Sequence, residues 1–388
     1  MLLYLAFWFA TLLLTLPGGK LLQALSVVII VLFIGFRYET GFDWPFYQDM
    51  YLNLSLDYVL SDWVYNYNLY GVELGFLFLV GNTAPVIGFE YFQAFVAVFF
   101  IYSTMMLART VGHKNPALAL AVCLTYLLLT LVFSTIRQCL AISLFNIGVA
   151  VYLQSYFSRT VRIWTVAVFF ALATSIQNSA LIYCMAFCYC SINLSQTAKR
   201  FLVILLVLLM IPAVIYPEIV SGLIESRAAA KIQFYSEVNS GLFNSVNAYY
   251  LILLAFISLG LLYAIPRSQI SKLDRLEKLV SFARVLLVIN ILCIPFAIAR
   301  DRISYELFIV ASILFTHQFA KLKLIFPTGL ITLGVFWSSF GTLYQYTGIV
   351  FIPYQNYLVY SLMDIPSDGR RRQEQFFEQY DQRLKSYR

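Results

Sequence analysis

The sequence predicts an all-α polytopic integral membrane protein with about 12 transmembrane helices. Hydrophobic residues make up 61% of the chain and charged residues only 12%, about half the usual share in a soluble domain. The apolar residues run in long blocks with few polar faces, a pattern typical of helices surrounded by lipid or by other apolar helices. These blocks are far longer than the alternating segments of about 10 residues that a membrane β-strand needs.

The spans follow from the positions of the apolar blocks along the chain. We expect them at residues 2–17, 21–36, 91–108, 116–134, 138–157, 163–176, 179–195, 201–217, 248–265, 282–299, 303–319 and 324–342. The first block lacks the basic start and the small-residue cleavage site of a signal peptide, so we expect it to remain as a span. Residues 73–90 have Gly, Asn and Pro near their centre and acids at both ends, which favours a re-entrant or interfacial segment.

These segments indicate one transmembrane domain and a tail. The domain covers residues 1–363, with outer loops at 37–72 and 218–247, and a charged C-terminal tail follows at 364–388.

The orientation follows from Lys and Arg, which favour cytoplasmic loops. If the N-terminus is outside and 73–90 does not cross, basic residues of the loops gather mainly at the inner face. An inner N-terminus with a crossing 73–90 segment gives the same balance, because only Lys20 and Arg37 change sides. Charge counting leaves both topologies open, and the interrupted 73–90 segment favours the first.

A small set of basic residues stands at the outer face, against this rule. The set consists of Arg37, Arg137, Arg227, Lys231, Arg300 and Arg302. Four of its arginines lie at predicted span ends, where ionisable residues are functional candidates. An arginine at a helix end also snorkels to the interface, and Arg302 has Glu306 one turn later as an ion-pair partner. Arginine is suited to bidentate contact with phosphate, so the set also indicates a phosphate site.

The first outer loop combines carboxylates with aromatic rings. Its acids are Glu39, Asp43, Asp49, Asp57, Asp62 and Glu73. Carboxylates serve as general bases or bind sugar hydroxyls, whereas the rings of this loop also suit an interfacial aromatic belt. Both histidines, His113 and His317, fall on the predicted inner side, so the base at the outer face has to be a carboxylate or the surroundings of the acceptor itself. The six cysteines have no metal-site spacing, and we expect neither a metal nor another cofactor.

Several short motifs of the chain, taken in order, resemble the EpsG-type family of bacterial polysaccharide polymerases, the Wzy-like enzymes. The stretch RYETGFDWPFYQDMY carries the first, and its matching residues are Arg37, Gly41, Asp43, Tyr47 and Tyr51. The later motifs match at Glu73, Gly75 and Phe76, at Arg137, Gln138 and Ala141, at Arg302 and Tyr305, and at Pro353, Tyr354 and Asn356. One position departs from the family pattern: Gln177 stands before Asn178, where the family has His. This departure favours a binding role for Gln177.

The resemblance implies a substrate, a reaction and a location. The substrate is an oligosaccharide repeat unit on undecaprenyl diphosphate at the periplasmic face of the bacterial inner membrane. The growing chain passes from one lipid diphosphate to a sugar hydroxyl of a second unit, and the product is O-antigen or exopolysaccharide. The partners implied are these lipid-linked oligosaccharides, the bilayer and a chain-length regulator, with no nucleic acid.

Residue roles follow from this chemistry. Fixed arginine donors stabilise a departing diphosphate without a metal, and we assign this role to Arg137 and Arg302. Asp43 is the candidate base or acceptor-orienting group. The candidate substrate-binding residues are Arg37, Glu73, Gln138, Gln177, Arg300, Tyr305 and Tyr354.

Two other functions remain open. A transporter or flippase for the same lipid-linked sugars also needs outer arginines, but it should carry polar residues along a path through the bilayer. The mid-helix polar set is thin, with Gln23, Asn146 and Asn290. A glycosyltransferase that uses a lipid-monophosphate sugar should have paired acids in the first outer loop, and Asp43 and Asp49 meet that requirement.

Overall fold

The structure is a computed structural model that describes residues 2–14, 20–54, 72–154, 156–191, 274–293, 297–321 and 346–386. The described residues are mainly helical and contain no β-strand, as the apolar blocks predict. The chain divides into two compact units, each described here by itself. The first contains Met1–Leu181 and Phe308–Asp381, and the second contains Ile182–Leu307 and Gln382–Arg388.

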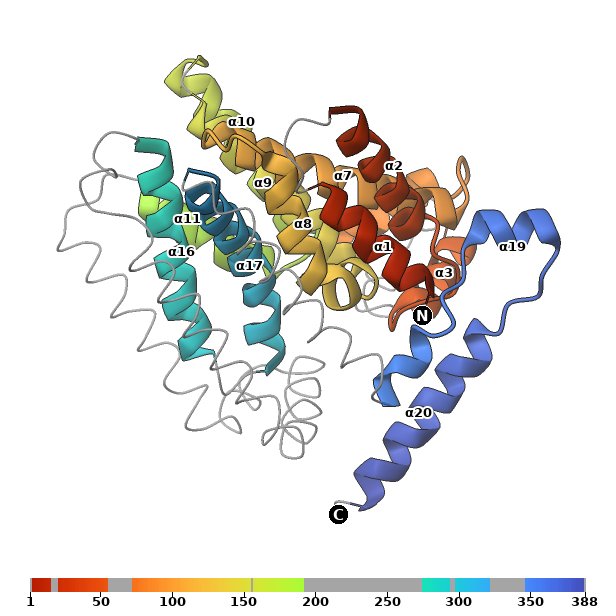
Figure 1. The fold of residues 1–388 in the computed structure, drawn as a ribbon. Helices are drawn as coiled ribbons and strands as arrows, with labels where there is room; N and C mark the ends of the chain where they lie inside the picture. The colour runs from red at the N-terminus through yellow and green to blue at the C-terminus, as the bar shows by residue number, and fades with distance from the viewer. Residues whose placement is uncertain are drawn as a thin grey trace, which may run out of the picture. The chain divides into compact units, whose positions relative to one another are not determined.

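The first unit holds most of the described helices (Figure 1). They are α1 (Leu2–Leu13), α2 (Lys20–Gly35), α3 (Trp44–Asn53), α6 (Leu74–Thr83), α7 (Phe89–Thr110), α8 (Pro116–Leu127), the π-helix η1 (Leu128–Val132), α9 (Ile136–Leu153) and α10 (Arg159–Ile176). Local sequence sets several of their starts. Pro116 begins α8 in the first turn, where its missing N–H has no intrahelical partner to lose, and the Ser158 hydroxyl caps α10 by accepting from the Val161 N–H.

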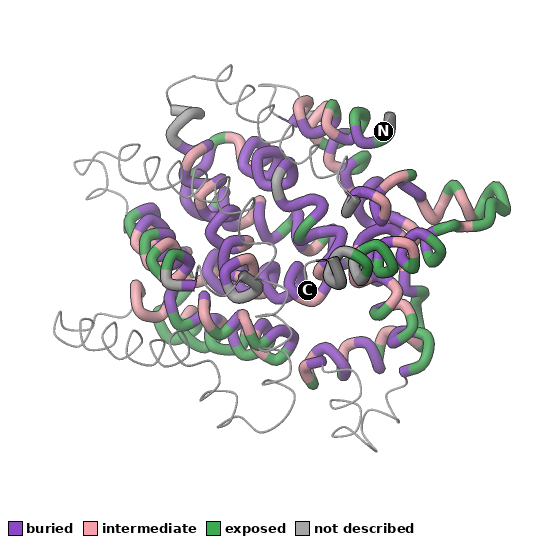
Figure 2. The backbone as a smooth tube through the Cα atoms, turned by 90° about the horizontal axis from the view of Figure 1, so that it is seen from below, coloured by how far each residue is buried: buried purple, intermediate pink, exposed green. Residues whose placement is uncertain are grey.

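Helix α9 forms the core of this unit. It packs against α7 on one side and α10 on the other, while α2 packs against α1 and α7. Its residues from Ile136 to Leu153 are mostly buried, whereas α10 turns most of its surface outward. The buried stretches are drawn purple in Figure 2. A helix that is apolar all round and exposed on one side suits a position at the lipid boundary.

Three helices among the described residues are long and apolar enough to cross a membrane, namely α7, α9 and α10. Helix α6 is a different case, because its 10 residues at 1.5 Å each span about 15 Å, half of the ~30 Å hydrocarbon core. It covers the start of the interrupted 73–90 segment. The predicted spans 201–217, 248–265 and 324–342 and the loop 218–247 lie outside the described residues.

The later helices differ from the predicted spans. Helix α11 (Ala180–Ser191) matches its prediction, but α16 runs over Asp274–Leu292 and α17 over Ala297–Lys321. The predicted boundary at 299–303 is therefore wrong, and Arg300 and Arg302 lie inside the first turns of α17. No helix breaker stands between Ala297 and Ile303, so the helix continues through these polar residues.

The described residues 346–386 also contain helices. A 3₁₀ turn, η2 (Tyr346–Val350), leads to the short helix α19 (Tyr357–Met363) and then to α20 (Gly369–Ser386). Asp364 ends α19 in the left-handed conformation, with φ of 51°. The segment predicted as a charged tail thus contains an 18-residue helix.

Candidate functional site

Arg137 lies in the first turn of α9, and two other helices hold its guanidinium. Its Nε donates to the Tyr47 hydroxyl of α3 at 3.0 Å. Its Nη1 forms an ion pair with Glu73 Oε2, just before α6, at 2.5 Å. The guanidinium also lies 5.8 Å from the centre of the Tyr47 ring, a cation–π distance. The Arg137 side chain is therefore fixed in one orientation before any ligand binds.

Part of this guanidinium stays available. Within the part of the chain that the structure describes, Nη2 of Arg137 has no hydrogen-bond partner. The side chain is 15% exposed, so a ligand reaches it without unfolding the helix end. An arginine already fixed by two contacts loses little further side-chain entropy when its remaining donors bind an oxyanion.

Glu73 connects three helices at this point. Its Oε2 contacts Arg137, and its Oε1 accepts the backbone N–H of Asn178, in the turn between α10 and α11, at 3.0 Å. Gly75 permits this approach, because a Cβ there would lie 2.3 Å from the Ser175 hydroxyl of α10. Both carboxylate oxygens are therefore engaged, and the Glu73 carboxylate orients the Arg137 guanidinium.

The turn between α10 and α11 supplies the next contacts. The Ser179 hydroxyl donates to Gln138 Oε1 at 2.9 Å, which joins this turn to the first turn of α9. Gln138 and Gln177 are both buried, and Gln177 ends α10 through its backbone N–H to the Ala173 carbonyl. The amide of Gln177 does not titrate, so this position cannot supply a base.

Asp43 stands at the start of α3, one turn before Tyr47. Its side chain does not cap the helix, although the residue occupies the N-cap position. The charges of Asp43 and Glu73 both act on the Arg137 guanidinium. The structure therefore brings Asp43, Glu73, Arg137 and Gln138 together in one cluster at the helix ends. In the sequence these residues belong to separate motifs.

Arg37 and Tyr354 form a separate, buried group. Arg37 is 2% exposed, with Nη1 donating to the Ile34 carbonyl at 3.0 Å and its guanidinium 5.3 Å from the Phe133 ring. Its Nε and Nη2 have no partner among the described residues, and burial lowers the pKa of Arg37 to about 10. The Tyr354 hydroxyl donates to the Phe33 carbonyl. In this conformation Arg37 is covered, so a phosphate contact there requires the cover to move.

The other predicted residues, Arg300, Arg302 and Tyr305, belong to the second unit. Arg300 is buried and forms an ion pair with Asp301 at 3.0 Å. Arg302 and Tyr305 are half-buried on α17. Glu306, the suggested ion-pair partner of Arg302, is fully buried, and its carboxylate oxygens have no hydrogen-bond partner among the described residues. The Arg302–Glu306 pair is thus not formed.

Asp49, the second acid of the metal-dependent alternative, is engaged elsewhere. It pairs with Arg370 of α20 at 2.9 Å. It also follows Asp43 by six residues, which places the two side chains about 120° apart around α3. Among the described residues, no three His, Cys, Asp or Glu side chains form a possible metal site.

Three residues of the cluster were not predicted as site residues, namely Tyr47, Asn178 and Ser179. Tyr47 follows Asp43 by four residues, and this spacing places both on one face of a helix. Asn178 contributes only its backbone N–H, for which no residue pattern exists.

Comparison with known proteins supports the polymerase class. No curated protein and no solved structure matches the chain. A model of the EpsG family matches residues 20–361, from the start of α2 into α19, and this range includes every residue of the Arg137 cluster. The match covers most of the 388 residues, so the chain belongs to the EpsG family of membrane polysaccharide polymerases.

Proposed function

We propose that this protein joins oligosaccharide repeat units carried on undecaprenyl diphosphate, at the outer face of the bacterial inner membrane. The fixed guanidinium of Arg137, with donors still available beside two carboxylates, is the observation that supports this proposal most directly. Membership in a polymerase family supplies the reaction class.

The reaction needs a stabilised leaving group. The bond between the sugar anomeric carbon and the diphosphate oxygen breaks, and its electron pair leaves with the diphosphate. Arg137 Nη2 donates to the oxygen that gains charge. Because this donor is positively charged and preorganised, the proposed chemistry needs no metal ion.

The acceptor hydroxyl needs a base. Its oxygen forms the new bond to the anomeric carbon, and its proton passes to the Asp43 carboxylate. Glu73 is less suited to this step, since Arg137 and the Asn178 N–H occupy both of its oxygens. Gln177 cannot replace it, because an amide takes no proton at physiological pH.

The grouping of the predicted outer loops supports the proposed location. The ends of α3, α6, α9 and α10 that form the cluster all belong to the predicted outer loops. His113 and His317, predicted at the inner side, lie with ring centres 5.7 Å apart in the same unit. This grouping of segments supports the preferred topology, in which α6 is an outer segment that does not cross.

The test is a reconstituted reaction with purified protein and lipid-linked repeat units in vesicles, with a chelator and no added divalent ion. We expect longer lipid-linked chains and released undecaprenyl diphosphate, both measured by mass spectrometry. Movement of units across the bilayer without longer chains contradicts the proposal and supports a flippase. A strict need for a divalent ion, or a monophosphate product, supports the lipid-monophosphate alternative.

A further inference from the structure

We propose that Arg372 of α20 is a positioning residue for the site, because it holds the backbone segment from which Asp43 and α3 begin. This inference rests on the proposed function. Helix α20 lies beyond residue 361, where the family match ends, so family membership does not predict a role for it.

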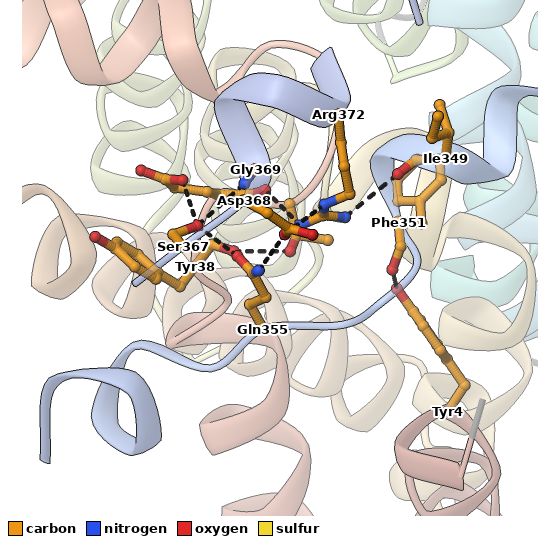
Figure 3. A network of polar contacts seen from close by, with 11 residues as sticks. Tyr4, Tyr38, Ile349, Phe351, Gln355, Ser367, Asp368, Gly369 and Arg372 are labelled. Carbon is orange, nitrogen blue, oxygen red and sulfur yellow. Dashed lines mark hydrogen bonds and ion pairs between the residues drawn. The ribbon is translucent and has the colours of Figure 1, made fainter. Parts of the chain in front are cut away.

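Arg372 connects three segments of the first unit (Figure 3). Its Nε donates to Asp368 at 2.8 Å, which fixes the guanidinium against its own helix. Its Nη1 donates to the Ile349 carbonyl in η2 at 3.3 Å, and its Nη2 donates to the Glu39 carbonyl at 3.4 Å. The residue is only 5% exposed, so these contacts are largely shielded from water.

The segment that Arg372 holds adopts an unfavourable backbone conformation. Glu39 has φ of 47°, a region that residues other than glycine rarely occupy, and Gly41 has φ of 110°, which glycine adopts because it has no Cβ. Gly41 also lies so close to the Phe133 carbonyl that a Cβ would be 2.5 Å from its oxygen. Such a conformation persists only where surrounding contacts impose it.

The C-terminal segment provides those contacts. Its members bind the backbone of residues 39–42 at several points: the Gly41 N–H donates to the Val350 carbonyl at 3.1 Å, and the Gln373 amide donates to the Phe42 carbonyl. The Ser367 hydroxyl contacts the Glu39 carboxylate and Gln355 Oε1. The backbone just before Asp43 is thus fixed from α20 and η2.

The fixed segment leads directly into the site. Asp43 follows Phe42 and starts α3, and the Tyr47 hydroxyl on the same helix contacts Arg137 Nε. A shift of residues 39–42 therefore displaces the candidate base and one of the two contacts that orient Arg137. Arg372 touches neither substrate nor Arg137, so its effect passes through this segment.

Arg372→Gln in the vesicle assay tests the inference. We expect kcat to fall about 10- to 100-fold, as for a misplacement of about 1 Å, while KM for the lipid-linked donor changes little because Arg137 keeps its ion pair with Glu73. Arg371→Gln is the matched control, since it removes the same charge from an exposed neighbour and should leave kcat unchanged.

A double-mutant cycle separates positioning from general stability. If Arg372 acts through α3, Arg372→Gln should cost less in a Tyr47→Phe background than in the wild type. Equal losses in both backgrounds, or kcat of Arg372→Gln within twofold of wild type, overturn the inference. If Arg372→Gln lowers the amount of folded protein, Gln373→Leu replaces it as the test variant. The inference is then overturned if kcat of Gln373→Leu is within twofold of wild type.

The two proposals fail in distinguishable ways. If Arg372→Gln is active while Arg137→Lys is not, the polymerase site stands and α20 has no part in it. If Arg137→Lys is also active, the site assignment itself fails.

Discussion

Replacement of Arg137 by Lys is the sharpest test of the site, because it keeps the charge and changes the geometry. Arg137 uses Nε for Tyr47 and Nη1 for Glu73, which leaves Nη2 for a ligand. Lysine has a single side-chain nitrogen. If it retains the ion pair with Glu73, it loses the contact to Tyr47 and the donor that points to the ligand.

The expected loss of rate follows from the hydrogen-bond donors that the substitution removes. Removal of one preorganised donor to a developing oxyanion costs roughly 2.7–4 kcal/mol, or ~100- to 1,000-fold in rate. If Arg137 were a snorkelling side chain, Lys would replace it with almost no loss, since both have long apolar stems and a charged end. The two roles therefore differ by at least two orders of magnitude in rate.

The assay is the length distribution of surface polysaccharide in cells that carry only the variant. We expect the ladder to collapse to single repeat units while the protein stays in the membrane at its normal level. Arg109→Lys is the matched control, because Arg109 is an exposed residue in the last turn of α7, on the predicted inner side. A normal ladder with Arg137→Lys refutes the phosphate role of Arg137.

Three further predictions test the base, the topology and a buried histidine. Glu73→Gln keeps the size of the side chain and one of its two acceptor oxygens, and it should reduce polymerisation less than Asp43→Asn, which should abolish it. The reverse order in the vesicle assay identifies Glu73 as the base. In a Cys-free background, Ser361→Cys should react with an impermeant thiol reagent in intact spheroplasts, whereas Ser158→Cys should react only after lysis. Labelling of position 158 from outside would contradict the predicted topology. Burial lowers the pKa of His113 to about 4, below about 6.5 in an unfolded chain. The unfolded state therefore binds more protons between these values, and stability should fall as pH drops from 7 to 5. Thermal unfolding in detergent should show this fall, and His113→Gln should reduce it.

The fold class was readable from the sequence, but the helix ends were not. Apolar blocks identify the part of a helix that faces lipid or core, and they gave α7, α9, α10 and α11 closely. They failed at α16 and α17, where the helices extend through charged turns. Hydropathy does not register a polar helical turn, so Arg300 and Arg302 were placed in a loop.

The sequence was sufficient to predict candidate site residues, but not the contacts between them. Arg137 stood out because it violated the charge rule, and Asp43 and Glu73 because they are acids of the first outer loop. Their pairing was not visible, since Arg137 and Glu73 are 64 residues apart and meet only through tertiary packing. Gly75 contributes to this packing by its small size, which composition alone does not reveal.

The role of the last helix was hidden for a related reason. Helix α20 is polar, and its Arg372 binds two backbone carbonyls, at Ile349 and Glu39. Every residue has a carbonyl, so such contacts leave no pattern in the sequence. The segment predicted as a charged tail thus supplies an arginine that binds the backbone of the first outer loop.

The charge balance of the cluster limits what the first unit binds alone. Arg137 carries one positive charge, while Glu73 and Asp43 carry two negative ones when ionised. A diphosphate adds further negative charge, and like charges at close range repel strongly where water is excluded. Arg37 does not offset this charge in the observed conformation, because it is covered. Binding of a diphosphate at this cluster therefore requires a cation beyond Arg137, and a further arginine supplies that charge without a metal ion.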